Sequence, residues 1–539
     1  MPRSSVFFRR LRPLVALLAA ALIGASCGGG GDDSAGEDLG PEPARASGQD
    51  LRVAVGQDPF LPGNPPSPNL GLVTNGPNPG IFETLTRLTG SFGLQPGLAT
   101  RWESPSPEQW RFFLRPNVTF HNGARLDAAA VVGTLETIAA RQNRPRGLDP
   151  GTARANGDVV ELTLTTPNAR LAEQLANPSM GIQAPGTTAA GGGDPSQTPT
   201  GTGPFRFESY SPGSNLVVRA YENYWGAKAQ LTSLTFRFGP ERDAGRLLAT
   251  RQVELVGHVP YEFLPKVSGR TDSVKGSQPA RAEYLLLNTG GVDDFATLKD
   301  DNVRRAIALA IDRDAVQKAA WPEDGEDNDS LIPGVVLGEA AGTVRAANQN
   351  LNESRRLLDQ SGWGPGPDGI RAKQGRPLNL SLVLARPDEQ QKAGETVKGQ
   401  LAAVGIAVNI VDPAPESPFT RVNASTFDLF MASQVQDDGN PCALCRFFTI
   451  RPGGSLAFGS SVGGGAKADE LYDRSYTTAS QDSARRIAAE LINVVVAERF
   501  TAVPLASLRT EWLISPRVRG FEPAALGGDQ RWESVWLTV

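Results

Sequence analysis

The sequence predicts an α/β protein divided into lobes, and three observations support this class. From residue 301 onward, amphipathic helical segments alternate with short apolar strands, which indicates an α/β unit with a largely parallel sheet. The first half is instead rich in short strands of alternating polarity. Without residues 1–26, the remaining 513 residues suggest roughly three structural units.

The N-terminus has the pattern of an export signal. Arginines at positions 3, 9, 10 and 12 precede residues 13–26, which are apolar or small and contain no charge. This apolar run of roughly 14 residues is shorter than the roughly 20 that span a bilayer. We therefore predict a signal peptide at residues 1–26. The Arg9-Arg10 pair leaves the general secretory and twin-arginine routes both open.

A cysteine follows the signal directly. Gly24, Ala25 and Ser26 before Cys27 resemble the bacterial lipobox, in which the thiol receives a diacylglycerol and becomes the first residue after cleavage. We expect lipidated Cys27 to anchor the exported protein at the outer face of the cell membrane. Residues 27–47 are rich in Gly and acidic residues, which predicts a flexible tether. The alternative is an ordinary secretory signal that happens to end near a cysteine.

The charge balance argues against one class of partner. Loss of residues 1–26 lowers the number of basic residues from 53 to 49, against 58 acidic residues, for a formal net charge of −9. A mildly acidic exported protein has no electrostatic basis for binding nucleic acid. The hydrophobic content of 40% is ordinary for a globular chain, and no second apolar span is present.

In the first half, one helix has a clear start. Asp127 is the expected N-cap, because apolar residues recur behind it at helical spacing, among them Val131, Leu135 and Ile138. Residues 185–204, rich in Gly, Thr, Pro and Ser, indicate a long loop or a boundary. Strands are expected at 51–55, 111–115, 160–164, 205–210, 215–221 and 233–238.

In the second half, residues 301–320 are expected to form one helix, with Val303 and Ile307 on its apolar stripe. A last helix at 482–500 precedes a short strand at 502–506. Between them we expect a helix at 352–361, a strand at 378–384, a helix at 390–404, and strands at 406–411 and 427–433.

One long block resembles a known family signature. Residues 98–136, LATRWESPSPEQWRFFLRPNVTFHNGARLDAAAVVGTLE, closely resemble the signature of the family 5 extracellular solute-binding proteins, which are the oligopeptide, dipeptide and nickel receptors of ABC importers. Further blocks agree in order: PTGTGPF, then ENYWG, then YLLLNTG before VRRAIALAIDRDAV, and VVVAERFTAVPL near the end. The resemblance covers most of residues 51–520.

The resemblance implies a two-lobed α/β fold like that of periplasmic binding proteins (type II, cluster C) with an extra sub-domain, whose lobes close over a ligand. It implies the following domains: lobe I at 48–80, 200–285 and 505–539; the extra sub-domain at 81–199; and lobe II at 286–504.

The resemblance also implies a function. The chain would capture a di- or oligopeptide, or a similar small solute, and deliver it to ABC permease and ATPase subunits as a monomer without a cofactor. Alternatives are a receptor for a nickel chelate or another small solute, and a sensing lipoprotein without a transport role.

The resemblance assigns two candidate ligand residues. Asp437 takes the place of the family aspartate that pairs with the ammonium of a bound peptide, and a carboxylate in a closed site suits that task. The alternative is a solvated loop acid, and neighbouring Asp438 leaves the register open. Tyr284 takes the place of a family aromatic residue that lines the ligand site, but a tyrosine there is also compatible with plain core packing.

The remaining reactive side chains are few. Cys442 and Cys445 form a C-x-x-C pair, for which we favour a local disulfide that fixes the ligand loop, with buried free thiols as the alternative. His121 is expected to serve the turn at FHNG, and His258 has no supporting constellation. With two histidines, no nucleophile elbow and no P-loop, we expect neither a metal site nor catalysis.

Overall fold

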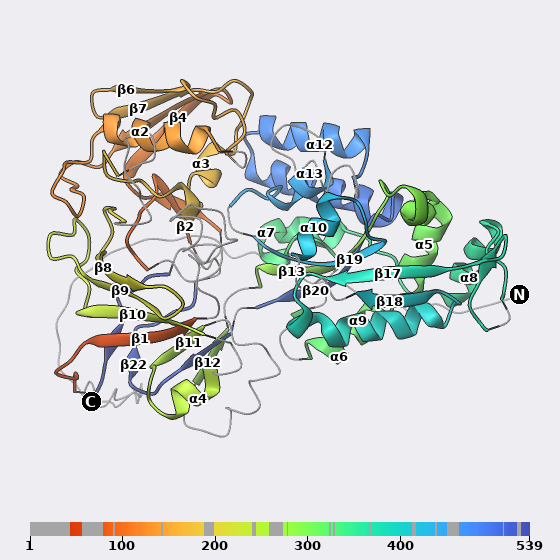
Figure 1. The fold of residues 1–539 in the computed structure, drawn as a ribbon. Coiled ribbons are helices and arrows are strands. Elements are labelled where there is room, and N and C mark those ends of the chain that lie inside the picture. The colour runs from red at the N-terminus through yellow and green to blue at the C-terminus, as the bar shows by residue number, and fades with distance from the viewer. Residues whose placement is uncertain are drawn as a thin grey trace, which may run out of the picture. The chain divides into compact units, whose positions relative to one another are not determined.

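Strands from distant parts of the chain form three sheets of four or more strands in the computed structural model (Figure 1). The expected signal peptide and most of the expected tether, Cys27 included, lie outside the described residues. Within the described part of the chain, no helix is both long enough and apolar enough to cross a membrane. The structure describes residues 44–55, 79–89, 92–141, 144–187, 199–239, 244–257, 273–276, 279–322, 325–326, 329–366, 368–411, 417–436, 439–449, 463–509, 511–524 and 530–539.

The seven-stranded sheet has the order β12-β21-β11-β1-β10-β9-β8. Its middle strand β1 (Asp50–Val55) runs parallel to β10 (Ser233–Phe238) and to β11 (Leu255–Gly257). The other pairs are antiparallel and involve β8 (Phe205–Ser211), β9 (Asn215–Ala220), β12 (Ser273–Gly276) and β21 (Glu511–Ile514). The expected strands at 51–55, 205–210, 215–221 and 233–238 are confirmed.

The four-stranded sheet is antiparallel, with the order β4 (Ala99–Ser106), β5 (Gln109–Leu114), β7 (Val159–Thr163) and β6 (Ala153–Asn156). Helix α2 (Ala128–Ala139) contacts β6 and β7. It begins where the sequence predicts, because the Asp127 side chain accepts a hydrogen bond from the Ala130 amide at 2.8 Å. Its apolar stripe, including Leu135 and Ile138, is fully buried in the core of this sheet.

The six-stranded sheet has the order β14-β20-β13-β19-β17-β18. The expectation of a largely parallel sheet is wrong, because three of its five strand pairs are antiparallel. Only β17 (Asn379–Leu384) is parallel to its neighbours, β18 (Ala407–Val411) and β19 (Leu429–Val435). The antiparallel pairs involve β13 (Arg281–Leu287), β14 (Gly325–Glu326) and β20 (Ala502–Leu508).

The parallel part of this sheet follows from one connection. Parallel neighbours need a long crossover, and helix α9 (Pro387–Ala402) supplies it between β17 and β18 (Figure 1). Polar and apolar residues do not alternate along Leu285–Leu287 of β13, because the sheet has an apolar core on each face. Leu286 belongs to one core, and Leu285 and Leu287 belong to the other.

The single helix expected at 301–320 is two helices, α5 (Asp301–Ala310) and α6 (Arg313–Ala320). Ile311 has extended backbone angles, and the Asp312 side chain accepts a hydrogen bond from the Ala315 amide at 3.0 Å. The apolar stripe continues across the break, but Asp312 starts a new helix as its N-cap.

The helix expected at 482–500 also ends earlier. Helix α13 (Gln481–Asn493) passes into a π-helical turn at Val494–Glu498 before β20.

The remaining helices are α3 (Leu171–Gln174), α4 (Ala244–Ala249), α7 (Gly334–Leu337), α8 (Leu351–Gln360), α10 (Pro418–Asn423) and α12 (Ala466–Thr477). Short 3-10 helices cover Pro178–Met180, Asp293–Lys299, Gly338–Thr343 and Leu444–Phe448. Three small ribbons pair β2 (Thr86–Leu88) with β3 (Leu94–Pro96), β15 (Ala372–Lys373) with β16 (Arg376–Pro377), and β22 (Val518–Arg519) with β23 (Trp536–Leu537).

The chain passes between the seven-stranded and six-stranded sheets at two neighbouring places. It leaves through β12 to β13 and returns through β20 to β21. Gly276 pairs with Glu511, and Arg281 pairs with Leu508, so the strand residues that flank the two crossings are neighbours at both ends. The boundaries expected at 285/286 and 504/505 fall inside β13 and β20. Because both strands pair within the six-stranded sheet, the change of sheet comes after Gly276 and before Arg281 on one crossing, and after Leu508 and before Glu511 on the other.

Candidate functional site

The candidate site is the loop that follows β19, residues 436–449, which we call the ligand loop. In α/β sheets, ligands bind outside the carboxyl ends of parallel strands, and the loop follows the carboxyl end of β19, a strand that runs parallel to β17. Asp437 and Asp438 lie outside the described residues, so the role of Asp437 stays a prediction. Their neighbours Gln436 and Gly439 are described, and they fix the two ends of this acidic pair.

The start of the ligand loop is tied to the crossing between the sheets. The Gln436 amide donates a hydrogen bond to the carbonyl of Ala280 at 2.8 Å, and Ala280 lies in the crossing segment before β13. The Gln436 side chain donates to the carbonyl of Asn440 at 3.0 Å. Gln436 and Asn440 are both fully buried. The backbone on either side of residues 437–438 is therefore fixed by buried hydrogen bonds.

A disulfide closes the next turn of the ligand loop. Cys442 and Cys445 are bonded, and both side chains are fully buried in a core that includes Phe448. The Cys442 amide donates to the side-chain oxygen of Asn440 at 3.0 Å, which joins this turn to the preceding segment. The turn is thus held both by a covalent bond and by Asn440.

Tyr284 lies in the core behind this loop. Its side chain is 1% exposed, and its ring centroid lies 6.2 Å from that of Phe448. Burial raises the pKa of Tyr284, so the phenol is neutral, and within the described residues its hydroxyl has no hydrogen-bond partner. In this conformation the side chain packs in the core and offers no surface to a ligand. Its part in ligand binding stays a prediction.

A buried charge cluster lies at the same end of the six-stranded sheet. The Glu283 carboxylate accepts hydrogen bonds from Ser433 at 2.6 Å and from Gln390 at 2.7 Å. Arg281 lies 3.4 Å from Glu283 and 2.8 Å from Glu389. Burial raises the pKa of Glu283, although Arg281 opposes this effect. The sequence analysis missed this cluster, because alternating Arg and Glu at the start of a strand is common on solvated surfaces.

Residues of two motif blocks, ENYWG and PTGTGPF, pack around the Glu83 carboxylate, which no pattern in the sequence singles out. Glu83 accepts hydrogen bonds from Trp225 Nε1 at 2.8 Å, from the Tyr224 hydroxyl at 2.8 Å and from the Thr202 hydroxyl at 2.9 Å. Burial raises the pKa of Glu83, and the three hydrogen bonds oppose this shift. The ENYWG and PTGTGPF blocks therefore meet at Glu83 and have a structural role here.

The glycines of PTGTGPF permit a close backbone approach. A Cβ atom on Gly201 would lie 2.1 Å from the carbonyl oxygen of Ile81, and one on Gly203 would lie 2.1 Å from that of Gly80. No other residue fits without moving the backbone.

His121 serves this same region. Its Nε2 lies 3.0 Å from the carbonyl of Gly203, and its Nδ1 accepts from the Gly201 amide at 3.4 Å. Both ring nitrogens therefore have protein partners. His258 lies outside the described residues. In the segments that the structure describes, no group of three or more His, Cys, Asp or Glu side chains is arranged to hold a metal ion.

Comparisons with known sequences agree with the motifs. Residues 93–453 match the model of the bacterial extracellular solute-binding proteins, family 5 (middle). Protein XP55 of Streptomyces lividans is 27% identical over 367 residues, which cover 64% of this chain and 66% of that protein, slightly under two thirds of its length. The nickel-binding periplasmic protein and the dipeptide-binding protein of Escherichia coli are each 24% identical, over 65% of this chain and 69% of their own.

Solved structures show the same fold. NikA from Brucella suis in complex with Fe(III)-EDTA has a TM-score of 0.76 at 22% identity, covering 91% of this chain and all of that one. DppA from Helicobacter pylori in complex with the peptide STSA has a TM-score of 0.72 at 19% identity, covering 91% of this chain and 98% of that one. The chain therefore has a two-lobed α/β fold of the periplasmic-binding-protein type.

Proposed function

Because this chain belongs to the bacterial extracellular solute-binding proteins of family 5, we propose that it captures di- or oligopeptides outside the cytoplasm and delivers them to an ABC permease. The coarser role follows from the family, whose members bind solutes for importers. The choice of a peptide as the ligand is the proposal.

One observation supports the choice of a peptide as the ligand. Buried hydrogen bonds of Gln436 and Asn440 fix the backbone on both sides of residues 437–438, at the carboxyl end of β19. A carboxylate in a closed, partly dry site makes charge-assisted hydrogen bonds of about 1.5–3 kcal/mol with an ammonium group. Asp437 is therefore proposed to bind the amino terminus of the peptide. Ligands without that cation would bind more weakly.

The closure of the lobes is proposed to link capture to delivery. The ligand binds the closed form better than the open form, and the permease and its ATPase recognise the closed form. Cys27 is proposed to carry the lipid that anchors the protein at the outer face of the membrane. The tether expected at 27–47 is proposed to end at residue 44, because Arg45 forms a bridge with Thr538 and the Ala46 amide donates to the carbonyl of Leu537 at 2.9 Å. A monomer suffices for this cycle, and the proposed role involves no catalysis and no cofactor.

The test begins with the bound molecule. Native mass spectrometry of the purified protein identifies what co-purifies with it, and a peptide is the expected result. Calorimetry with trialanine then compares Asp437→Ala with its matched control, Asp438→Ala. We expect at least a tenfold loss of affinity in Asp437→Ala only, and weak binding of N-acetyl-trialanine to every form. Unchanged affinity in Asp437→Ala removes this residue from the site.

A nickel chelate is the second candidate ligand, favoured by the E. coli nickel-binding relative at 24% identity. Both ring nitrogens of His121 are already bonded within the protein, so this side chain is not available to such a complex. Nickel in the purified protein, detected by elemental analysis together with an organic chelator, would favour this candidate. Normal ligand binding without any dependence of uptake on the protein would instead favour a sensing role.

A further inference from the structure

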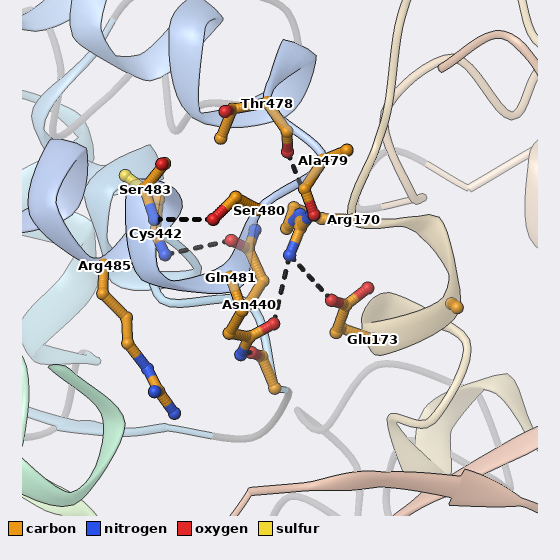
Figure 2. Close-up of polar contacts among 12 residues, drawn as sticks. Arg170, Glu173, Asn440, Cys442, Thr478, Ala479, Ser480, Gln481, Ser483 and Arg485 are labelled. Carbon is orange, nitrogen blue, oxygen red and sulfur yellow. Dashed lines mark hydrogen bonds and ion pairs between the residues drawn. The ribbon is translucent and has the colours of Figure 1, made fainter. Parts of the chain in front are cut away.

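Arg170 joins the sub-domain at 81–199 to the helices that follow the ligand loop. Its guanidinium forms an ion pair with Glu173 at 2.9 Å and donates to Gln481 Oε1 at 3.1 Å. The side chain is only 3% exposed. Figure 2 shows Arg170 between Glu173 and the segment from Thr478 to Gln481. An arginine this deeply buried does not contact solvent or a solute.

The same guanidinium caps a helix end. It donates to the carbonyls of Thr478 at 2.9 Å and Ala479 at 2.6 Å, directly after α12 ends at Thr477. Carbonyls at a helix C-terminus lack partners within the helix, and a cation is favourable at that end of the helix dipole. Ser480, the next residue, is the N-cap of α13. Arg170 therefore fixes the junction between α12 and α13 from outside these helices.

Two contacts lead from this junction to the ligand loop. Gln481 Nε2 donates to the carbonyl of Gly439 at 3.4 Å, and Gly439 directly follows residues 437–438. Glu173 packs on the same residue, since a Cβ atom on Gly439 would lie 3.4 Å from Glu173 Cγ. Both Glu173 and Gln481, which are partners of Arg170, therefore contact Gly439.

A second, parallel path runs through Tyr476. Its hydroxyl accepts hydrogen bonds from Gln174 at 3.3 Å and from Asn440 at 3.0 Å. Gln174 lies in the same short helix as Glu173, and Asn440 is the neighbour of Gly439. The sub-domain thus reaches two successive residues of the ligand loop.

We propose that Arg170 is a positioning residue for ligand recognition: from the 81–199 sub-domain it fixes the ligand loop through Gln481 and Gly439, without contact with the ligand. This inference deepens the proposed function and rests on it for the ligand class. Affinity for a peptide then depends on a side chain outside the binding surface, because a loop without this support must be ordered when the ligand binds.

The test uses hydrogen-exchange mass spectrometry on the full-length protein. Arg170→Met combined with Glu173→Gln removes the charges as a pair and leaves no buried carboxylate alone. The matched control is Arg144→Met with Asp149→Asn, an ion pair at 2.6 Å in the same sub-domain that is more exposed. Gln481→Ala is a second variant, which keeps the ion pair of Arg170 with Glu173 and removes the hydrogen bonds of Gln481 with Arg170 and Gly439.

We expect at least fivefold faster exchange at residues 436–449 in the Arg170 double variant and at least twofold in Gln481→Ala. Exchange at 205–220, in another sheet, is expected to stay unchanged, as is exchange everywhere in the control. Unchanged exchange at 436–449 in the folded variants overturns the inference. If the double variant does not fold, Gln481→Ala decides the question alone.

A binding measurement separates this inference from the proposed function. For trialanine we expect at least a tenfold lower affinity in the Arg170 double variant than in the control, mainly through faster dissociation. If the unmodified protein does not bind trialanine but exchange at 436–449 still rises, the peptide proposal fails and the positioning role of Arg170 stands. If trialanine binds equally to both variants, the role of Arg170 in recognition is refuted.

Discussion

Asn440 and Tyr476 meet through a hydrogen bond of 3.0 Å between Nδ2 and the phenolic oxygen, both groups being buried. Asn440 also accepts from the Cys442 amide and, through its carbonyl, from Gln436. Asn440 therefore connects the disulfide turn and helix α12 through its side chain, and the start of the ligand loop through its backbone carbonyl. A change in any of these contacts is expected to alter the others.

The first prediction concerns Tyr476→Phe. The substitution removes the oxygen that accepts from both Asn440 and Gln174. Loss of a shared acceptor at a buried site costs about 1–3 kcal/mol of the free energy of unfolding. Urea unfolding measures this loss, and exchange at 439–442 should rise with it. The adjacent Thr477→Ala, whose hydroxyl bond is exposed, is the control and should stay within about 0.5 kcal/mol.

The second prediction concerns His121 and pH. Burial, together with the charge of Arg206, lowers the pKa of His121 to about 4. Because the folded state keeps this ring neutral, its contribution to stability is complete above the unfolded pKa of about 6.5 and is lost as pH falls toward 4. The loss is at most about 3 kcal/mol. NMR titration of His258→Gln, in which His121 is the only histidine, should give a midpoint near 4; a midpoint near 6.5 contradicts the prediction.

The third prediction concerns the disulfide. Cys442→Ala with Cys445→Ala is expected to lower the free energy of unfolding by roughly 2 kcal/mol, the chain-entropy value for so short a loop. Both sulfurs are fully buried, so the bond should resist reduction until the protein unfolds. Alkylation followed by mass spectrometry measures this resistance. Labelling of either cysteine in native protein without a reductant would show that the thiols are free.

The fourth prediction concerns the break between α5 and α6. Asp312→Ala removes the N-cap acceptor of the Ala315 amide and should cost about 1 kcal/mol. The matched control is Asp314→Ala, which removes a first-turn acid and leaves the cap intact. Thermal unfolding of both variants compares them. Equal melting temperatures would show that the hydrogen bond of Asp312 adds nothing to the stability of α6.

Much of the fold could be predicted because local patterns decide it. Asp127 could be predicted as an N-cap, because its residue type and the helical spacing of the apolar residues after it are enough to identify the start of the helix. Asp312 was missed because the apolar stripe from Val303 onward continues in register across the break, which hides the N-cap. The direction of β13 could not be predicted either. It depends on the pairing with β19 and β20, which lie more than 140 residues further along the chain.

The candidate site was less predictable. The pairing of Cys442 with Cys445 could be predicted from their short spacing, whereas the role of the loop that contains them stays a prediction. The roles of Arg170 and Glu83 could not be predicted, because each depends on a partner distant in sequence. Arg170 bonds to Gln481, and Glu83 bonds to Trp225. Residues whose role depends on the tertiary fold are not visible in a single sequence.

The order of strands in the seven-stranded sheet has a consequence for biogenesis. β21 lies between β12 and β11 in the sheet but follows both of them in the chain by more than 230 residues. Until residues 511–514 are synthesised, both of its neighbours have an open edge, which is a site for intermolecular pairing. A chain cut after residue 508 would keep those edges exposed, and we expect it to aggregate.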